Sequence, residues 1–309
     1  MADHLCAPIP RLPDAGQLVL SDDLPLQIGG CASNAAMDLA RLGVNVGVIG
    51  CVGQDPFGRF IIETLAAANV RTEGIRQLAD VPTSGTLIIN VQGQDRRFIH
   101  TIGANGRFDA SSVSLDQVRQ CKVFYVGGYL LMGGLAQEGL LVLFREARRS
   151  GVKTVLDVVL PGPGDHWARL DKLLSETDVF LPNTDEAAII TGRHDPVEQA
   201  QQFRDAGCGA AVITCGGQGT VLLTDQHRVM AGTYPTTFVG GTGAGDAFDA
   251  GYIAGLLAGQ DPLGCLRWGS ALGASCVRAI GATESVFTRP EAEAFLEQHE
   301  LPLQELGSR

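Results

Sequence analysis

The sequence predicts an α/β protein with a central, mostly parallel sheet, helices on both of its faces and a small additional β-sheet. From residue 122 onward, short apolar strands alternate with helical segments, an order that implies right-handed crossovers between parallel strands. Two β-rich segments, approximately residues 15–30 and 83–103, lie outside this alternation and predict the small sheet. A length of 309 residues suits one core with an appendage. A single domain over residues 1–309 is therefore expected.

Composition and charge narrow the class of protein. Apolar residues make up 45% of the chain, which contains 40 glycines and no repeated motif, as expected of a globular protein with many tight turns. The apolar stretches are shorter than a membrane span, and the residues after Met1 lack the features of a signal peptide. A cytoplasmic location is expected. A net charge of −11 argues against binding to nucleic acid or to an anionic membrane.

The eight cysteines show no C-x-x-C pair and no spacing typical of a zinc site. Most lie in apolar surroundings, as Cys51 does in Val48-Ile-Gly-Cys-Val52. Small buried thiols in a reducing compartment fit this pattern. Neither disulfides nor structural zinc are expected.

The elements follow in chain order. The pattern of residues 17–28 predicts two short strands with a polar turn at 21–23. A helix is predicted after Gly29-Gly30, and it is expected to end at Gly43. A hairpin is predicted at residues 86–102, with its turn at Gln92–Asp95. The alternating part predicts strands at residues 123–126, 154–157, 179–181, 210–214 and 220–224, and helices at about 134–150, 165–174, 247–257 and 263–280.

The stretch from Val239 to Gly251 carries the strongest chemical signal. After a short extended run, Thr237–Val239, the glycine-rich turn Gly240–Gly245 leads directly into a helix. Unbonded first-turn N–H groups and the helix dipole favour an anion at this point. Asp246 in the first turn would be out of place beside a phosphate alone, but it suits a base that takes a proton from an attacking hydroxyl. The alternative is an acidic residue that merely favours the helix start.

Two other glycine-loop motifs fit poorly. Asp246-Ala247 stands where a P-loop requires Lys-Ser/Thr. The glycines at 241, 243 and 245 lack the dinucleotide-binding spacing and lie late in the chain.

The segment Thr242-Gly-Ala-Gly-Asp-Ala-Phe248 resembles the C-terminal signature of the ribokinase-like, PfkB-type carbohydrate kinases. The resemblance extends from Asp3 to about Phe295. It implies a ribokinase-like three-layer sandwich with a small β-sheet lid over the substrate. It also implies that Asp246 is the catalytic base and that the amides of Gly243, Ala244 and Gly245 stabilise charge on the transferred phosphoryl group.

The resemblance also implies a substrate site. Gly29-Gly-Cys-Ala-Ser-Asn34 is similar to the family motif G-G-x-x-x-N, so the Gly30 backbone and the Asn34 amide are expected to contact substrate hydroxyls. Asn105 in Gly103-Ala-Asn105 is a further candidate, and Cys31 stands where ribokinases often have lysine. For Asn34 alone, an ordinary residue at a helix start remains an equal alternative. Arg96, Arg97 and His100 would recognise an anionic sugar from the lid or simply be solvated residues of an edge hairpin.

Asp3 matches the last residue of the Asn-x-Asp that ends the first buried strand in the family, which makes it a candidate ligand of sugar hydroxyls. Only Met1 and Ala2 precede it. The first strand is missing from this sequence, the start site is misassigned, or the protein manages without a central strand. All three explanations stay open.

The nucleotide and metal sites are implied in the same way. Asn183 and Glu186 resemble the family N-x-x-E motif and would hold Mg²⁺ through water. The alternative is a capping pair, with Asn183 as N-cap and Glu186 at N3, and the two explanations are compatible. A plain hairpin turn competes with nucleotide binding at Cys215–Gly219. Gly240 replaces an aspartate that often helps to hold a monovalent cation, so such a cation is not predicted. The implied nucleotide contacts are Asn183, Glu186, Thr214, Gly216, Gly219, Ser270 and Ala274.

These observations predict an ATP- and magnesium-dependent kinase that phosphorylates a hydroxymethyl group of a sugar or sugar-like substrate. A nucleoside kinase on the same scaffold and a non-catalytic sugar- or nucleotide-binding protein are the alternatives. The expected partner is a small molecule, and the resemblance adds a homodimer formed through the lid.

Overall fold

The computed structural model describes residues 1–94, 96–162 and 164–307. Its largest sheet has the strand order β13-β12-β11-β10-β9-β8-β7, in which β7 to β10 are parallel and β10 to β13 antiparallel. The strands are β7 (Val123–Val126), β8 (Lys153–Leu156), β9 (Val179–Phe180), β10 (Ala210–Thr214), β11 (Thr220–Leu223), β12 (Arg228–Ala231) and β13 (Leu303–Glu305).

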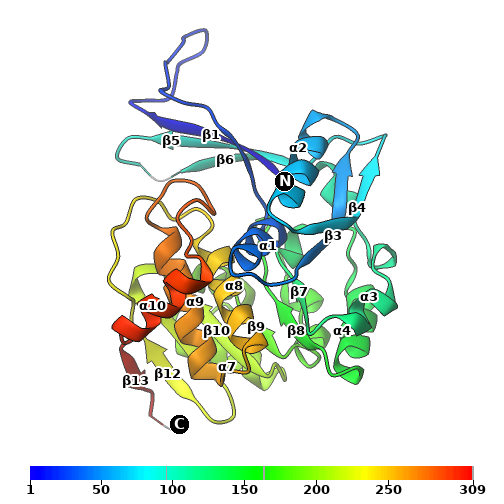
Figure 1. Cartoon of the computed structure of the whole chain (residues 1–309), viewed down its shortest axis with the longest axis vertical. Helices are drawn as coiled ribbons and strands as arrows, with labels where there is room; N and C mark the ends of the chain where they lie inside the picture. Colours follow the sequence, from blue (N-terminus) through cyan, green and yellow to red (C-terminus); the bar gives the residue numbers. More distant parts are fainter. Residues whose placement is uncertain (95, 163, 308–309) are drawn as a thin grey trace.

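Helices cover both faces of this sheet, as Figure 1 shows. Successive side chains of one strand enter opposite cores, because strand residues alternate in direction. Val155 packs with α1, α8, α9 and α10, whereas Leu156 packs with α4 to α7. The helices are α1 (Cys31–Arg41), α2 (Pro56–Ala67), α3 (Leu115–Gln120), α4 (Gln137–Arg149), α5 (Asp171–Leu174), α6 (Thr184–Thr191), α7 (Pro196–Asp205), α8 (Ala244–Leu257), α9 (Pro262–Cys276) and α10 (Arg289–Gln298).

Two smaller sheets complete the fold. β3 (Gly47–Gly53) and β4 (Arg71–Leu78) form a parallel pair connected through α2. The lid sheet, defined here as β2-β1-β5-β6, extends from one end of the molecule (Figure 1). The predicted α/β three-layer fold with a separate small sheet is confirmed. The lid strands are β1 (Ala2–Ile9), β2 (Leu26–Ile28), β5 (Gly85–Val91) and β6 (Arg97–Thr101).

The lid differs from the prediction in its first strands. β1 lies between β2 and β5 and contains Asp3, so the lid sheet extends beyond the predicted ranges 15–30 and 83–103. The strand expected at Val19–Leu20 is wrong, since residues 10–25 are irregular and Leu18 and Leu20 are exposed. The β5–β6 hairpin is confirmed, although Asp95 of its predicted turn lies outside the described residues.

Three other elements also differ. The helix predicted at 165–174 is a short 3₁₀ turn, Trp167–Arg169, followed by the four residues of α5. Trp167, Leu170 and Leu173 recur every third residue, which suits a 3₁₀ turn. The extended run at Thr237–Val239 is a loop with no partner strand among the described residues, and the N–H groups of Val239 and Gly240 donate to the Val277 carbonyl. The last predicted helix ends earlier, at Cys276.

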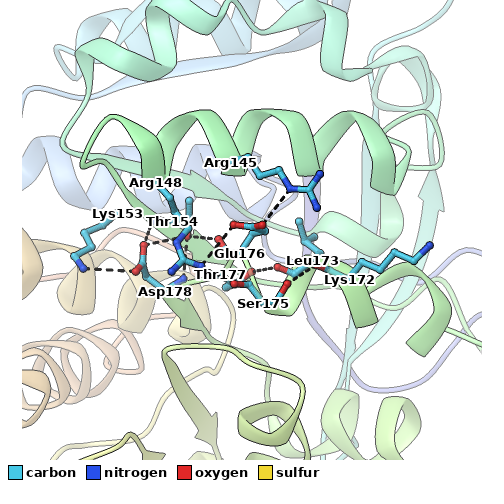
Figure 2. Close-up of polar contacts among 10 residues, drawn as sticks. All are labelled: Arg145, Arg148, Lys153, Thr154, Lys172, Leu173, Ser175, Glu176, Thr177 and Asp178. Carbon is cyan, nitrogen blue, oxygen red and sulfur yellow. Dashed lines mark hydrogen bonds and ion pairs between the residues drawn. The ribbon is translucent and has the colours of Figure 1, made fainter.

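A cluster of ion pairs and hydrogen bonds connects α4 and β8 with the residues just before β9 (Figure 2). Glu176 binds Arg145 of α4 at 3.1 Å, and Asp178 binds Lys153 at 3.5 Å. Asp178 also accepts a hydrogen bond from the Thr154 backbone at 2.9 Å. Exposed pairs contribute little stability, so the backbone bond matters most: it fixes the register of the strands that lead toward the site.

The eight cysteines, all within the described residues, are unpaired. No helix in that part of the chain is long and apolar enough to cross a membrane.

Candidate active site

The glycine-rich turn and the start of α8 form the floor of the site. Gly243 has φ 76°, and a Cβ there would lie 2.4 Å from the Ala282 carbonyl oxygen, so only glycine fits. A Cβ on Gly245 would meet nothing within 4 Å, which means that this side of the turn is open. Within the described chain, the N–H groups of Gly243 and Gly245 make no hydrogen bond. They are available to an anion in front of the helix.

Asp246 and Asn34 bring the two ends of the chain together. The Asn34 Nδ2 donates to Asp246 Oδ2 at 2.8 Å, across 212 residues of sequence. Asn34 is buried in the first turn of α1, which begins after Gly30 at φ 93°. The packed surroundings raise the pKa of Asp246, and the hydrogen bond from Asn34 works in the opposite direction. Asp246 is thus a carboxylate whose orientation is fixed and whose basicity is increased.

Further acidic groups surround this carboxylate. Ligand atoms of Cys31, Asp157 and Asp246 lie within 4.8 Å of one another. Burial raises the pKa of Asp157 well above its ordinary value, and repulsion from Glu186 and Asp246 adds to the effect. Asp249, one turn along α8, accepts a hydrogen bond from the Tyr125 hydroxyl at 2.8 Å. Sequence reasoning had missed Cys31 and Asp157 as site residues. The signal for Asp157 was its position just after a parallel strand.

Asn183 and Glu186 do form the predicted capping pair at the start of α6. Asn183 Oδ1 accepts from the backbone of Glu186 at 2.9 Å, and Glu186 Oε2 accepts from the Asn183 N–H at 3.0 Å. Burial raises the Glu186 pKa to about 7, with Asp246 among the neighbouring charges. Glu186 therefore also faces the acidic cluster. Carboxylate oxygens held together against their repulsion suit Mg²⁺, which prefers oxygen ligands.

The lid brings Asp3 into the same region. Gly29 lets the carboxylate approach its backbone, because a Cβ there would lie 1.8 Å from Asp3 Oδ2. Burial raises the pKa of Asp3, while the Met1 ammonium group, the Thr86 hydroxyl on β5 and His100 on β6 act to lower it. Asp3 also lies within electrostatic range of Asp246. Asp3 is thus a partly buried acid near the site and not a solvated residue near the terminus.

Arg96 is the lid residue that reaches the glycine-rich turn. Its Nη1 donates to the Thr242 hydroxyl at 2.5 Å, and its guanidinium lies 5.7 Å from the centre of the Phe98 ring. Arg97 points elsewhere and binds Gln94, while His100 lies 3.1 Å from the Thr86 hydroxyl. Of the three basic lid residues considered from the sequence, Arg96 is the one beside the predicted phosphate site.

The predicted nucleotide contacts near the end of β10 differ in how closely other atoms surround them. Thr214 ends β10 beside Asn183, with which it forms an isolated parallel bridge. Gly216 would accept a Cβ without any contact, whereas at Gly219 a Cβ would lie 1.9 Å from the Ala231 carbonyl oxygen. Gly219 therefore has a packing reason to be glycine, whatever it binds.

The remaining candidate site residues lie on α9, in the turn after the lid and in the loop before α8. Ser270 is on α9, and its hydroxyl is buried without a partner among the described residues. The Ala274 carbonyl accepts a hydrogen bond from Thr236 at 2.7 Å. Asn105 lies in the 3₁₀ turn Gly103–Arg107, and its side chain makes no hydrogen bond to the described parts of the site. Gly240 packs against Ala279.

Comparison with known proteins agrees with this geometry. The family model described as pfkB family carbohydrate kinase matches residues 5–289. The chain belongs to the PfkB family of carbohydrate kinases. It is therefore an ATP-dependent carbohydrate kinase that transfers a phosphoryl group to an alcohol, and the alternative of a non-catalytic binding protein is set aside.

Individual relatives of this PfkB kinase span nearly all of it. A ribokinase from Haemophilus influenzae is 29% identical over 304 residues, which cover 96% of this chain and 95% of the relative. An aminoimidazole riboside kinase from Salmonella typhimurium is 28% identical, with coverage of 88% and 89%. The crystal structure of a putative ribokinase II from E. coli in complex with ATP and Mg²⁺ superposes with a TM-score of 0.82 over 96% of both chains at 24% identity. This last likeness shows the shared fold.

Proposed function

We propose that this kinase phosphorylates a hydroxymethyl group of a sugar or sugar-like substrate, with Asp246 as the general base. The observation that carries the proposal is the 2.8 Å hydrogen bond between Asn34 and Asp246. It joins a group that suits hydroxyl recognition to a carboxylate at the mouth of an anion site. A substrate hydroxyl bound by Asn34 would then lie beside its proton acceptor.

The glycine-rich turn and the first turn of α8 have two different roles in the phosphoryl transfer. Asp246 accepts the proton as the hydroxyl oxygen attacks the γ-phosphorus, and the phosphorus–oxygen bond to ADP breaks. The free N–H groups of Gly243 and Gly245, together with that of Ala244, donate to oxygens of the transferred group. One preorganised donor of this kind is worth about 3 kcal/mol in acyl-transfer enzymes, and we expect a similar order here.

Glu186 and Asp157 are the residues that would hold Mg²⁺, directly or through water, with Asn183 supporting Glu186 through the capping pair. When bound, the ion offsets the negative charge of the phosphates. It would also relieve the repulsion that raises the pKa values of these buried acids. Since their free carboxylates repel one another, the cluster favours a divalent cation with its nucleotide over an empty site.

The lid would bind the remainder of the substrate. Asp3, held beside Gly29, would accept hydrogen bonds from hydroxyls, while Arg96 would face the glycine-rich turn. Closure of such a lid would exclude water and limit wasteful hydrolysis of ATP. The exposed lid strands would also carry a homodimer contact.

The test is an ADP-release screen of the purified protein with Mg²⁺. The panel would include ribose, fructose, 2-keto-3-deoxygluconate, adenosine, inosine and cytidine. With the best acceptor, Asp246→Asn should reduce kcat by about 10²- to 10⁴-fold, the usual contribution of a general base, and leave ATP affinity nearly unchanged. Asp249→Asn is the matched control, since its carboxylate binds Tyr125, and it should retain most of the turnover. Undiminished kcat in Asp246→Asn would remove that residue from the base role.

A nucleoside kinase is the second candidate, favoured by the similarity to the Salmonella aminoimidazole riboside kinase. The same panel separates the two candidates. Preferential phosphorylation of a nucleoside over every free sugar would select the second.

A further inference from the structure

One row of polar side chains crosses the lid sheet from β1 to β6. Asp3 pairs with Thr86 on β5, and Thr86 pairs with His100 on β6. Paired residues of neighbouring strands lie on the same face of a sheet. The adjacent pair, Leu87 and Ile99, belongs to the opposite face and is exposed. The polar row, defined here as Asp3, Thr86 and His100, therefore lies on the more buried face of the lid sheet.

The hydrogen bonds of the polar row run in one direction. A hydroxyl has one proton to donate, and an ionised carboxylate, which the nearby Met1 ammonium group favours at Asp3, can only accept. The Thr86 hydroxyl interacts with the Asp3 carboxylate, and its oxygen lies 3.1 Å from His100 Nδ1. Since the hydroxyl proton is directed to Asp3, the hydroxyl oxygen accepts from His100, and the ring proton is on Nδ1. Burial lowers the pKa of His100, so at neutral pH the ring is neutral and Nε2 is an acceptor.

The polar atoms left without a partner in this region are acceptors. Asp3 Oδ1, His100 Nε2 and Asn34 Oδ1 are buried and have no hydrogen-bond partner within the described residues. Asp3 lies against Gly29, just before the helix that carries Asn34, and Asn34 in turn donates to Asp246. Buried polar atoms without a partner are rare in proteins. A ligand that supplies several donors would satisfy all three acceptors.

We propose that the polar row binds a neutral polyhydroxy group, with two substrate hydroxyls donating to Asp3 Oδ1 and His100 Nε2. His100 then determines specificity, and Thr86 is the positioning residue that fixes the tautomer of His100. The inference rests on the proposed function, because it concerns the substrate of the same site. A phosphate or carboxylate at this position would supply no donor and would lie beside the Asp3 carboxylate. Neutral sugars and the ribose of a nucleoside therefore fit, whereas an anionic group here, the role first considered for His100, does not.

The first experiment determines the tautomer of His100 without substrate. The protein is labelled with ¹⁵N-histidine, and the signals of His100 among those of the six histidines are identified by their loss in His100→Phe. Above the ordinary histidine pKa of 6.5, a ¹H–¹⁵N correlation spectrum of the rings should show the His100 proton on Nδ1. In Thr86→Val, which lacks the hydroxyl, this preference should be lost. A proton on Nε2 in the unchanged protein, or an identical tautomer in Thr86→Val, would overturn the proposal.

The second experiment measures the contribution of His100 to substrate binding. With the best neutral acceptor of the ADP-release panel, His100→Phe should raise KM about 2- to 10-fold, as expected for one hydrogen bond between uncharged groups, and leave kcat nearly unchanged. His4→Phe is the matched control, because His4 belongs to the adjacent row and its ring lies 5.3 Å from that of Phe57. Equal KM values in the two variants would refute the role of His100, and so would faster turnover of 2-keto-3-deoxygluconate than of every neutral compound.

The two experiments separate this inference from the proposed function. A screen in which no compound is phosphorylated would contradict the proposed function alone, since the tautomer of His100 is measured in the absence of ATP and acceptor. Conversely, a proton on Nε2 would remove the acceptor from the polar row while the role of Asp246 stayed unaffected.

Discussion

At the residue scale, the protonation state of Asp246 depends on two opposing effects. Burial raises its pKa, which makes it a better proton acceptor but increases the fraction that is protonated at low pH. The hydrogen bond from Asn34 favours the ionised form. In the proposed mechanism, Asn34 thus keeps this partly buried carboxylate ionised and able to accept a proton, in addition to any contact with substrate.

Glu186→Gln should raise the concentration of Mg²⁺ that activity requires. The amide preserves the size of the side chain but removes a charge from the acidic cluster. The apparent affinity for Mg²⁺ should fall by about 10- to 100-fold, as is typical for groups that support a metal site. A titration of activity with Mg²⁺ measures this change. Asp185→Asn is the control, because Asp185 is exposed in the same turn. Equal Mg²⁺ requirements in the two variants would contradict the assignment.

Arg96→Gln should reduce kcat/KM for the sugar, because the guanidinium beside Thr242 is lost. Hydrogen bonds to charged groups contribute about 1.5–3 kcal/mol, which corresponds to about 10- to 100-fold. Steady-state kinetics with varied sugar measure the effect. Arg97→Gln, on the neighbouring residue that binds Gln94, should behave like the unchanged protein. A similar loss in both variants would indicate damage to the hairpin instead.

The polar residues of the candidate site could be predicted from sequence motifs, whereas the residues that pack around them could not. Asn34, Asp246 and Glu186 could be found from motifs that place them at helix starts. Asp157 had only a general signal, its position just after a parallel strand. The closeness of Cys31 and Asp157 to Asp246 depends on how α1, β8 and α8 pack, which has no local signature in the chain.

At the scale of elements, Asp55 ties α2 to the base of the lid. Its carboxylate accepts from Gly58 N–H at 2.8 Å and from the Thr83 backbone and hydroxyl at 2.7 and 2.6 Å. Burial acts to raise its pKa, but these hydrogen bonds outweigh burial and lower the pKa below 3.8.

Asp55→Ala should therefore lower the free energy of unfolding by about 1–2 kcal/mol, the usual value of a helix cap. Because the folded pKa is depressed, this contribution is complete above the ordinary value of 3.8 and is lost as the pH falls through the folded pKa. Urea unfolding at pH 7 and at about pH 3 measures the difference. A gap between variant and unchanged protein that is as large at pH 3 as at pH 7 would refute this account.

Element boundaries could be predicted where apolar periodicity and glycine stops agree. β7 was predicted without error, and α8 was predicted to end where it does, at Leu257. The prediction missed β1 (Ala2–Ile9), because polar and apolar residues do not alternate regularly in this segment and Pro8 interrupts it. Its pairing with β2 and β5 is a tertiary effect.

At the scale of the whole molecule, the lid exposes apolar surface far from the core. Phe98 and Ile99 are 58% and 62% exposed on β6, and Ile99 lies opposite Leu87 on β5. We expect these strands to form the dimer contact. Ile99→Glu should shift the protein from dimer to monomer in light scattering at micromolar concentration. Ile189→Glu, at an exposed position on α6, should leave the mass unchanged. A monomeric unchanged protein would exclude the dimer.

The three-layer architecture could be predicted because strand and helix alternate regularly after residue 122. The separate β3–β4 pair could not, because its distance from β7 depends on how segments far apart in sequence pack.

The distance along the chain between Asn34 and Asp246 has a consequence for synthesis. At about 5–20 residues per second, the 212 residues between them take about 10–40 s to translate. During that interval α1 has emerged but the helix that carries its acidic partner has not. With Asp246 in its proposed role as the base, we expect the growing polypeptide to have no kinase activity until α8 has been translated.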